Sequence, residues 1–157
     1  MQNRSFPDQE KLLESKLSGV LKRLKQKEKN KVLIVDDERS IRITLKNYFR
    51  AKGYSVETAI DGEDALENFI HSPSDLIITD LNMPRIDGLS LARKIKDISS
   101  ETLVIVLTAD NRLNSLQKSD RENIDYYLIK PFSLHDLETA VQLMLAKRKS
   151  MMNKLTS

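Results

Sequence analysis

From residue 31 onward, short apolar runs alternate with segments in which apolar residues recur at helical spacing. Five such runs occur, at 32–35, 55–60, 76–79, 103–107 and 126–129. Most are apolar on both faces, as in the central strands of a parallel sheet, whereas 55–60 alternates apolar and polar residues like an edge strand. The intervening segments, and the one that starts at Ser133, have apolar residues three or four apart. This alternation predicts an α/β fold, an open doubly wound sheet of five strands and five helices.

Residues 1–30 have a different pattern. A helix that starts near Pro7 and Asp8 and runs to about Lys27 would carry a narrow apolar stripe. The stripe consists of Leu13, Leu17, Val20 and Leu24, spaced by four, three and four residues. This spacing fits alternating d and a positions of a coiled coil over about two heptads. We therefore expect an extra N-terminal helix that mediates self-association or holds a partner; the alternative is a helix folded back on its own domain, or a frayed linker.

Charge divides the chain into three parts. Residues 1–31 carry nine Lys or Arg against four Asp or Glu, and residues 147–157 carry four basic residues and no acid, so the segment between them is acidic although the net charge is +3. We assign 1–30 to the helix and linker, 31–147 to one domain and 148–157 to a basic C-terminal tail. Because no aromatic residues are interleaved with the basic ones, we expect solvated ends and no binding to nucleic acid.

The composition excludes several classes of protein. There is no cysteine, which excludes disulfides and thiolate metal sites. The longest apolar runs are too short to span a bilayer, and the start of the chain lacks the apolar core of a secretory signal. We expect a soluble, cytoplasmic protein that does not associate with membranes.

Polar residues follow the predicted strands where the strands end. They are Asp36, Asp37, Asp80, Asn82, Thr108 and Lys130. Ligands of open α/β sheets bind beyond these strand ends. One such Asp is explained by helix capping, but three acids near one another repel unless a cation such as Mg²⁺ neutralises them. A nearby lysine and hydroxyl suit a phosphoryl group. Together they indicate an aspartyl phosphate intermediate.

Four blocks of sequence, 31–38, 79–88, 106–109 and 127–132, resemble the signature blocks of response-regulator receiver domains of two-component signalling. They occur in order and at fitting spacing, and the resemblance covers residues 31–147. It implies a flavodoxin-like fold with strand order 2-1-3-4-5.

The resemblance also implies roles for single residues. Asp80 resembles the phosphoacceptor. Asp37 resembles the acid that ligates magnesium, with Asp36 helping directly or through water, the backbone carbonyl of Asn82 as a further ligand, and Mn²⁺ as an alternative ion. Thr108 resembles the switch hydroxyl, Lys130 the phosphate-binding lysine with a cis bond to Pro131, and Tyr127 the aromatic that rotates inward. Asn82 and Asp110 flank the expected path of the water that hydrolyses the acyl phosphate. Without the resemblance, Tyr127 would be interpreted as simple packing.

The implied function is signal relay and not turnover of a substrate. A histidine kinase or phosphotransfer protein would donate the phosphoryl group. The surface of the domain's fourth helix, fifth strand and fifth helix would then contact a downstream protein. The fourth helix has Leu113 and Leu116 as its only strong anchors, which predicts a mobile element. Nothing after Lys147 is long enough for an output domain, so output is by protein contact or the chain is a piece of a longer protein.

Two other functions use the same residues. One is an interaction module that keeps the fold without phosphorylation, against which the complete set of acids, hydroxyl and lysine argues. The other is a phosphohydrolase, which usually has an acid where this chain has Asn82. A basic cluster of Arg93, Lys94 and Lys96 is interpreted as a solvated helix face.

Overall fold

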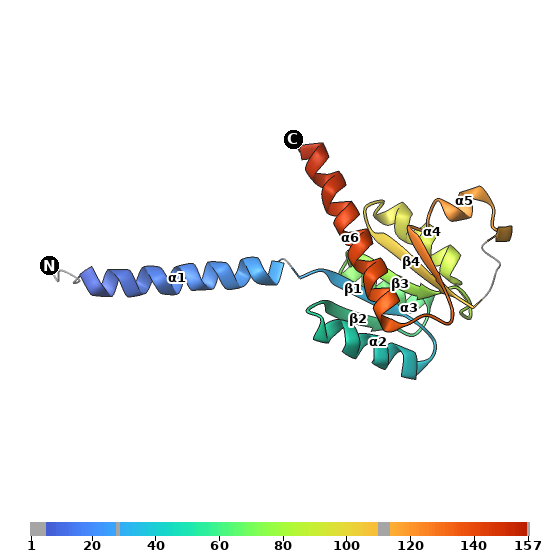
Figure 1. Ribbon diagram of the computed structural model, residues 1–157, viewed down its shortest axis with the longest axis horizontal. Helices are drawn as coiled ribbons and strands as arrows, with labels where there is room; N and C mark the ends of the chain where they lie inside the picture. The colour runs from blue at the N-terminus through green and yellow to red at the C-terminus, as the bar shows by residue number, and fades with distance from the viewer. Residues whose placement is uncertain (1–5, 28, 110–113, 157) are drawn as a thin grey trace. The chain divides into compact units, whose positions relative to one another are not determined.

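The computed structural model describes residues 6–27, 29–109 and 114–156. It divides into two compact units, Met1–Asn30 and Lys31–Ser157, which we describe separately. In its described part, the first contains the helix α1 (Phe6–Lys27). The second is built on a parallel sheet (Figure 1), with strands β1 (Lys31–Val35), β2 (Ser55–Ala59), β3 (Leu76–Asp80), β4 (Leu103–Thr108) and β5 (Tyr126–Ile129). The strand order is β2-β1-β3-β4-β5, and the extra N-terminal helix is present, so both predictions are confirmed.

Among the described residues, five helices accompany the sheet: α2 (Arg39–Ala51), α3 (Gly62–His71), α4 (Gly88–Ile98), α5 (Lys118–Arg121) and α6 (Leu134–Thr156). Alternate residues of each strand point to opposite faces. Val32 and Ile34 therefore join α2 and α6 in one hydrophobic core, and Leu33 and Val35 join α3 and α4 in another. Within the described ranges, none of the helices combines the length and the apolarity that crossing a bilayer requires.

Short polar side chains fix where three of the helices begin. Asp61 accepts a hydrogen bond from the Asp64 amide, and Asp87 accepts one from the Ser90 amide, at 2.8 Å each. At the start of α6, Ser133 Oγ accepts from the Asp136 amide at 3.0 Å, and the Asp136 carboxylate accepts from the Ser133 amide at 3.1 Å. Such caps satisfy amides that have no partner inside the helix. The helices therefore start directly beside the strand ends.

The helix α5 is a single turn, and none of its residues is buried. This agrees with the sequence-based expectation that few apolar residues anchor this helix, although Leu113 itself lies outside the described residues. Because so short a helix covers little of β5, Tyr127 and Ile129 remain half exposed on that side of the strand. The edge of the sheet at β5 is therefore an open surface.

The last helix runs on to Thr156, so the residues expected to form a basic tail, 148–156, are helical. The physical reason is visible at Arg148. Its guanidinium donates to the Asp75 carbonyl and to the Asp75 carboxylate, at 3.2 Å each. The same carboxylate accepts a hydrogen bond from the Lys31 amide at 2.8 Å. These contacts hold the extended helix against the amino ends of β1 and β3.

The interpretation of the basic cluster on α4 as a solvated face is wrong for Lys96. Its ammonium donates to the Thr102 carbonyl and to Asp125, at 2.7 Å each. Arg93 contacts Asp120 at 2.8 Å. These acids lie 27 and 29 residues further along the chain and reach α4 only because β5 pairs with β4. The two pairs tie α4 to α5 and to the start of β5.

Candidate functional site

The register of the sheet brings the polar strand ends to one edge. β3 lies between β1 and β4, with Val35 opposite Thr79 and Asp80 opposite Leu107. Asp36 therefore lies one position beyond the β1 end, next to the carboxyl end of β3. Thr108 ends β4 opposite Ile129, the last residue of β5. The structure thus brings together the acids, the hydroxyl and the lysine that the sequence assigned to the site.

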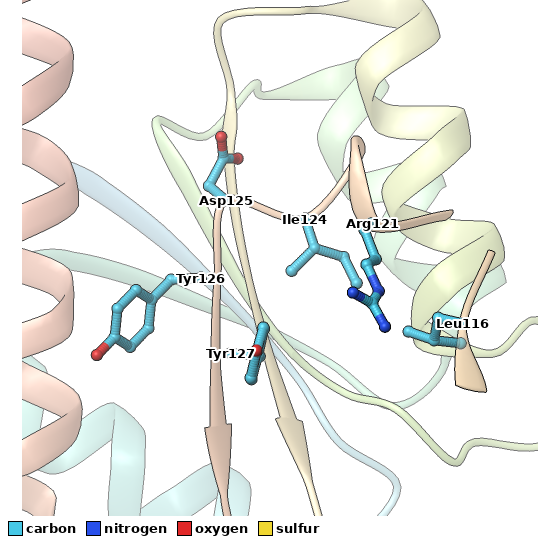
Figure 2. A pocket seen from close by; sticks show the side chains of 6 residues that line it. All are labelled: Leu116, Arg121, Ile124, Asp125, Tyr126 and Tyr127. Carbon is cyan, nitrogen blue, oxygen red and sulfur yellow. The ribbon is translucent and has the colours of Figure 1, made fainter. Parts of the chain in front are cut away.

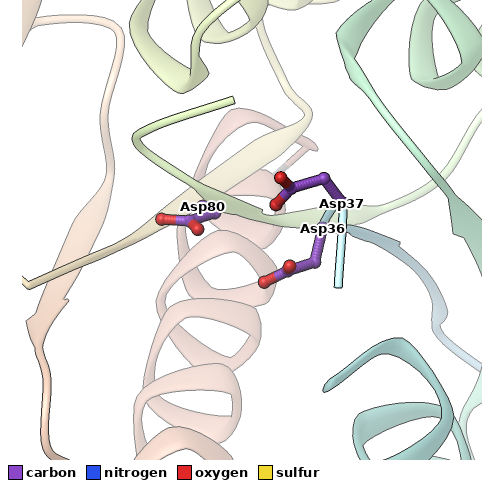
Figure 3. A group of neighbouring side chains, drawn as sticks. All are labelled: Asp36, Asp37 and Asp80. Carbon is purple, nitrogen blue, oxygen red and sulfur yellow. The ribbon is translucent and has the colours of Figure 1, made fainter. Parts of the chain in front are cut away.

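Three carboxylates form a cluster at this edge (Figure 3). Oxygen atoms of Asp36, Asp37 and Asp80 all lie within 4.8 Å of one another. Asp36 is only 1% exposed, whereas Asp37 is exposed and Asp80 is intermediate. The two neighbouring acids therefore differ: Asp36 is the buried member of the cluster, and Asp37 is the member open to solvent.

Asp36 is in an unfavourable environment for a charged group. One of its carboxylate oxygens accepts a hydrogen bond from the Glu38 amide at 2.8 Å. The other is buried and has no hydrogen-bond partner among the described residues. Burial raises the pKa of Asp36 from 3.8 to about 6, and the charges of Asp80 and Asp37 add to the rise, while the Glu38 amide and Lys130 oppose it. The cluster therefore offers a buried carboxylate oxygen without a hydrogen-bond partner in the described part of the chain, beside two further carboxylates. All of its ligand atoms are oxygens, which is the set that a hard divalent cation such as Mg²⁺ prefers.

Lys130 and Thr108 approach the cluster from the other side. The Lys130 ammonium lies 3.6 Å from the Asp80 carboxylate, and both side chains are partly buried. The Lys130 amide donates to the Thr108 carbonyl at 2.7 Å, and the peptide bond between Lys130 and Pro131 is cis. Thr108 is fully buried. Asp80 therefore lies between two other carboxylates, those of Asp36 and Asp37, and the strand ends that carry Lys130 and Thr108.

Two glycines fit the loop after Asp80 closely, and sequence reasoning missed both roles. A Cβ atom on Gly88 would lie 2.4 Å from the Asp80 carbonyl oxygen, and one on Gly62 would lie 2.7 Å from Ile86 Cβ. Each glycine follows a capping aspartate, so the Asp-Gly pairs were the signal that a helix starts against the loop after Asp80. Arg85 in the same loop has φ 69°, a left-handed conformation that side chains rarely adopt.

Replacing Gly88 by alanine should therefore displace the loop after Asp80. We expect a loss of about 1–3 kcal/mol in the free energy of unfolding, as for other overpacked sites. If Asp80 is the phosphoacceptor that the sequence resemblance implies, its phosphorylation should also be slower. Urea unfolding measures the first effect, and mass spectrometry of the chain treated with acetyl phosphate measures the second. Gly19→Ala is the control, because a Cβ at Gly19 meets nothing within 4 Å. Equal stability of the two variants would show that the loop adapts without cost.

Tyr127 lies over a cavity of about 380 Å³ at the open edge of the sheet (Figure 2). The cavity is lined by Leu116, Arg121, Ile124, Asp125, Tyr126 and Tyr127. The neighbouring Tyr126 packs with the core of α2 and α6, whereas Tyr127 is 50% exposed. The expected aromatic is thus on the surface beside a hollow bordered by α5 and β5.

Two expected positions have less support. Asn82 is exposed in the loop after β3, so its side chain is accessible to solvent, and the role of its carbonyl stays a prediction. Asp110 lies outside the described residues.

Comparison with known proteins gives one consistent family. The family model described as response regulator receiver domain matches residues 32–142. The transcriptional regulatory protein RprY of Bacteroides fragilis is 32% identical over 127 residues, which are 81% of this chain and 54% of the relative. The response regulator MprA of Mycobacterium leprae is 34% identical over 76% of this chain and 52% of its own length. The chain therefore spans about half the length of these curated relatives.

Solved structures agree with this comparison. The chemotaxis protein CheY4 of Vibrio cholerae has 32% identity and a TM-score of 0.68, covering 74% of this chain and 98% of that one. The response regulator TrrA of Thermotoga maritima, solved in complex with Mg²⁺-BeF, has 35% identity and a TM-score of 0.67, covering 73% of this chain and 98% of its own.

Proposed function

Because the chain belongs to the response-regulator receiver domain family of two-component signalling, we propose that Asp80 accepts a phosphoryl group from the phosphohistidine of a histidine kinase or phosphotransfer protein. The observation that carries the proposal is the placement of Asp80. Its carboxylate lies within 4.8 Å of two other acids and 3.6 Å from the Lys130 ammonium. An acceptor needs this environment, since the incoming group brings negative charge that cations must balance.

The transfer is an in-line displacement. An oxygen of Asp80 forms the new bond to phosphorus as the bond from phosphorus to the donor imidazole nitrogen breaks, and the imidazole leaves with the bonding electron pair. Lys130 balances charge on the phosphoryl oxygens. Asp36, Asp37, Asp80 and the Asn82 carbonyl would hold a divalent ion, Mg²⁺ or in its place Mn²⁺. When bound, the ion supplies positive charge that offsets repulsion between the carboxylates and the phosphoryl group.

Phosphorylation would then shift an equilibrium between two conformers. Thr108 ends β4, directly before the chain that leads to α5, so a hydrogen bond from its hydroxyl to the phosphoryl group favours the conformer in which β4 is pulled toward Asp80. Tyr127 lies beside the cavity on β5, and an inward rotation of its ring would change the outline of that surface. A downstream protein would read the surface made by α5, β5 and α6.

On this proposal the chain is a switch and not a turnover enzyme, and it catalyses only its own phosphorylation and dephosphorylation. The expected location is the cytoplasm, where a kinase and a downstream protein would be its partners. Relatives such as RprY are named as transcriptional regulators; for this chain we propose protein partners. A second copy of the chain is a further proposed partner, through α1.

Acetyl phosphate tests the proposal directly. With Mg²⁺ the chain should gain the mass of one phosphoryl group, and with EDTA it should gain none. Mn²⁺ in place of Mg²⁺ should restore the gain. No covalent mass under any of these conditions would favour a module that binds without phosphorylation. Repeated release of phosphate from small esters, many times per chain, would favour a phosphohydrolase.

The lifetime of the phosphorylated form should depend on Asn82. A hydrolytic water must approach the acyl phosphate past this exposed side chain. Asn82→Arg should obstruct that path and lengthen the lifetime about tenfold, equivalent to about 1.4 kcal/mol of barrier. The measurement is loss of phosphoryl mass with time after the donor is removed. Asn153→Arg, the same change at an exposed position of α6, should leave the lifetime unaltered; a shorter lifetime in Asn82→Arg would contradict the role.

A further inference from the structure

The helix α1 exposes an apolar stripe to water. Leu13, Leu17, Val20 and Leu24 are 59%, 53%, 44% and 51% exposed, and together they form one line along the helix. Isolated helices of about this length are marginal in water, because their backbone hydrogen bonds barely offset the entropy of ordering the chain. A stable α1 therefore needs a surface that covers this stripe.

The shape of the stripe favours another helix over a domain surface. Its members occupy successive d, a, d and a positions, and such a strict seam is narrower than the face by which a helix packs on a globular core. Ser15, Ser18 and Gly19 lie away from the seam, and Leu21 widens it on one side only. The two heptads between Leu13 and Leu24 offer two d and two a layers. A seam of this kind is complementary to itself, so a second copy of α1 fits it.

The charges at the g positions favour one direction for the second copy. Lys16 and Arg23 occupy the g positions, and Glu14 and Leu21 occupy e positions. An antiparallel pair places g positions side by side, which brings Lys16 of one copy next to Arg23 of the other. A parallel pair places each g position against an e position, so the aliphatic stem of Lys16 lies on Leu21. We propose that α1 binds a second copy of this chain as a short parallel two-stranded coiled coil.

A lipid surface fits α1 less well. Glu10 occupies the a position before Leu13 and Glu14 occupies an e position, so two carboxylates interrupt the apolar face that would enter a bilayer, although α1 as a whole is basic. The parallel arrangement also has a consequence for signalling. Each α1 leads into β1 through residues 28–30, so both domains leave the coiled coil at the same end. One assembly would then carry two Asp80 acceptors, whether or not either is phosphorylated.

Engineered cysteines test both the contact and its direction, because the chain has none of its own. In a parallel pair Leu13 faces the same residue of the second copy. Leu13→Cys in the full chain should therefore form a disulfide-linked dimer of twice 18.0 kDa on mild oxidation. Lys22→Cys, on the outer f position, should remain largely uncrosslinked. Crosslinking only in a mixture of Leu13→Cys and Leu24→Cys chains would overturn the parallel direction.

Light scattering on full chains without cysteine tests association itself. At concentrations where the wild-type mass approaches twice 18.0 kDa, Leu17→Glu should halve it by burying a charge in the seam. Ser18→Glu, on the outer b position, should leave the mass unchanged. Both variants should retain the thermal unfolding of the domain, since neither position is in that unit. A wild-type chain that stays monomeric, or that binds phosphatidylserine vesicles through α1 and does not dimerise, would overturn the proposal.

Discussion

Replacing Asp80 by asparagine is expected to abolish phosphorylation of the chain by acetyl phosphate. The amide keeps the size of the side chain but has no anionic oxygen to attack phosphorus, so no acyl phosphate forms. The loss should be complete in intact-mass measurements over times at which the wild type is fully modified. Because Asp80 also raises the pKa of Asp36 by repulsion, the variant should relieve part of that repulsion, while it loses the attraction between Asp80 and Lys130.

Asp87→Asn is the matched control for this experiment. Asp87 lies on the same loop, is exposed, and caps α4 by accepting from the Ser90 amide. Asparagine caps helices about as well as aspartate, so the fold should be preserved. The control should gain one phosphoryl group at the wild-type rate. If Asp80→Asn gains it at that rate as well, another side chain is the acceptor and the proposed function loses its central residue.

The second large effect concerns Asp36 and pH in the absence of divalent metal. The folded chain binds the proton of this carboxyl more tightly than the unfolded chain, because its pKa is about 6 and not 3.8. Well below pH 3.8 the group is protonated in both states and does not affect the free energy of unfolding. As pH rises toward 6 the unfolded state loses its proton first, so the free energy of unfolding falls, by up to about 3 kcal/mol for a shift of this size.

Urea unfolding in EDTA at pH 4, 5, 6 and 7 measures this decline. Asp36→Asn, which carries no titrating proton, should lack this part of the decline and should be the more stable protein at pH 7. Asp97→Asn, an exposed change on α4, should behave like the wild type. Identical pH profiles for the wild type and Asp36→Asn would mean that the carboxyl is not held in an unfavourable environment.

Magnesium should restore the free energy of unfolding that the ionised Asp36 carboxylate lowers at neutral pH. An ion that binds only the folded state adds stability according to its concentration, about 2.7 kcal/mol at one hundred times its dissociation constant. Both Asp36→Asn and Asp37→Ala should lose most of this gain, each by removing one carboxylate from the cluster. An equal gain from Mg²⁺ in the wild type and in Asp37→Ala would contradict direct ligation by Asp37.

The sequence determined the order of the elements and the contents of the site. Apolar runs such as 76–79 are continuous because both faces of a central strand are buried, and helical spacing between the runs marks the crossovers. The acids, Thr108 and Lys130 could be assigned to one edge because parallel strands end there together. The apolar runs and the helical spacing are local patterns, and the shared edge follows from the topology that those patterns predict.

Only the tertiary structure decided what each side chain experiences. Asp36 and Asp37 are neighbours of the same type, yet one is buried with an orphaned oxygen and the other is exposed. Lys96 was expected to be solvated, but it contacts Asp125, which is 29 residues away. The closeness of Gly88 to the Asp80 carbonyl was likewise invisible in the sequence. Burial, ion pairing and close approach depend on residues that are distant in the chain and meet only when the strands pair and the helices pack, so no local pattern of residues records them.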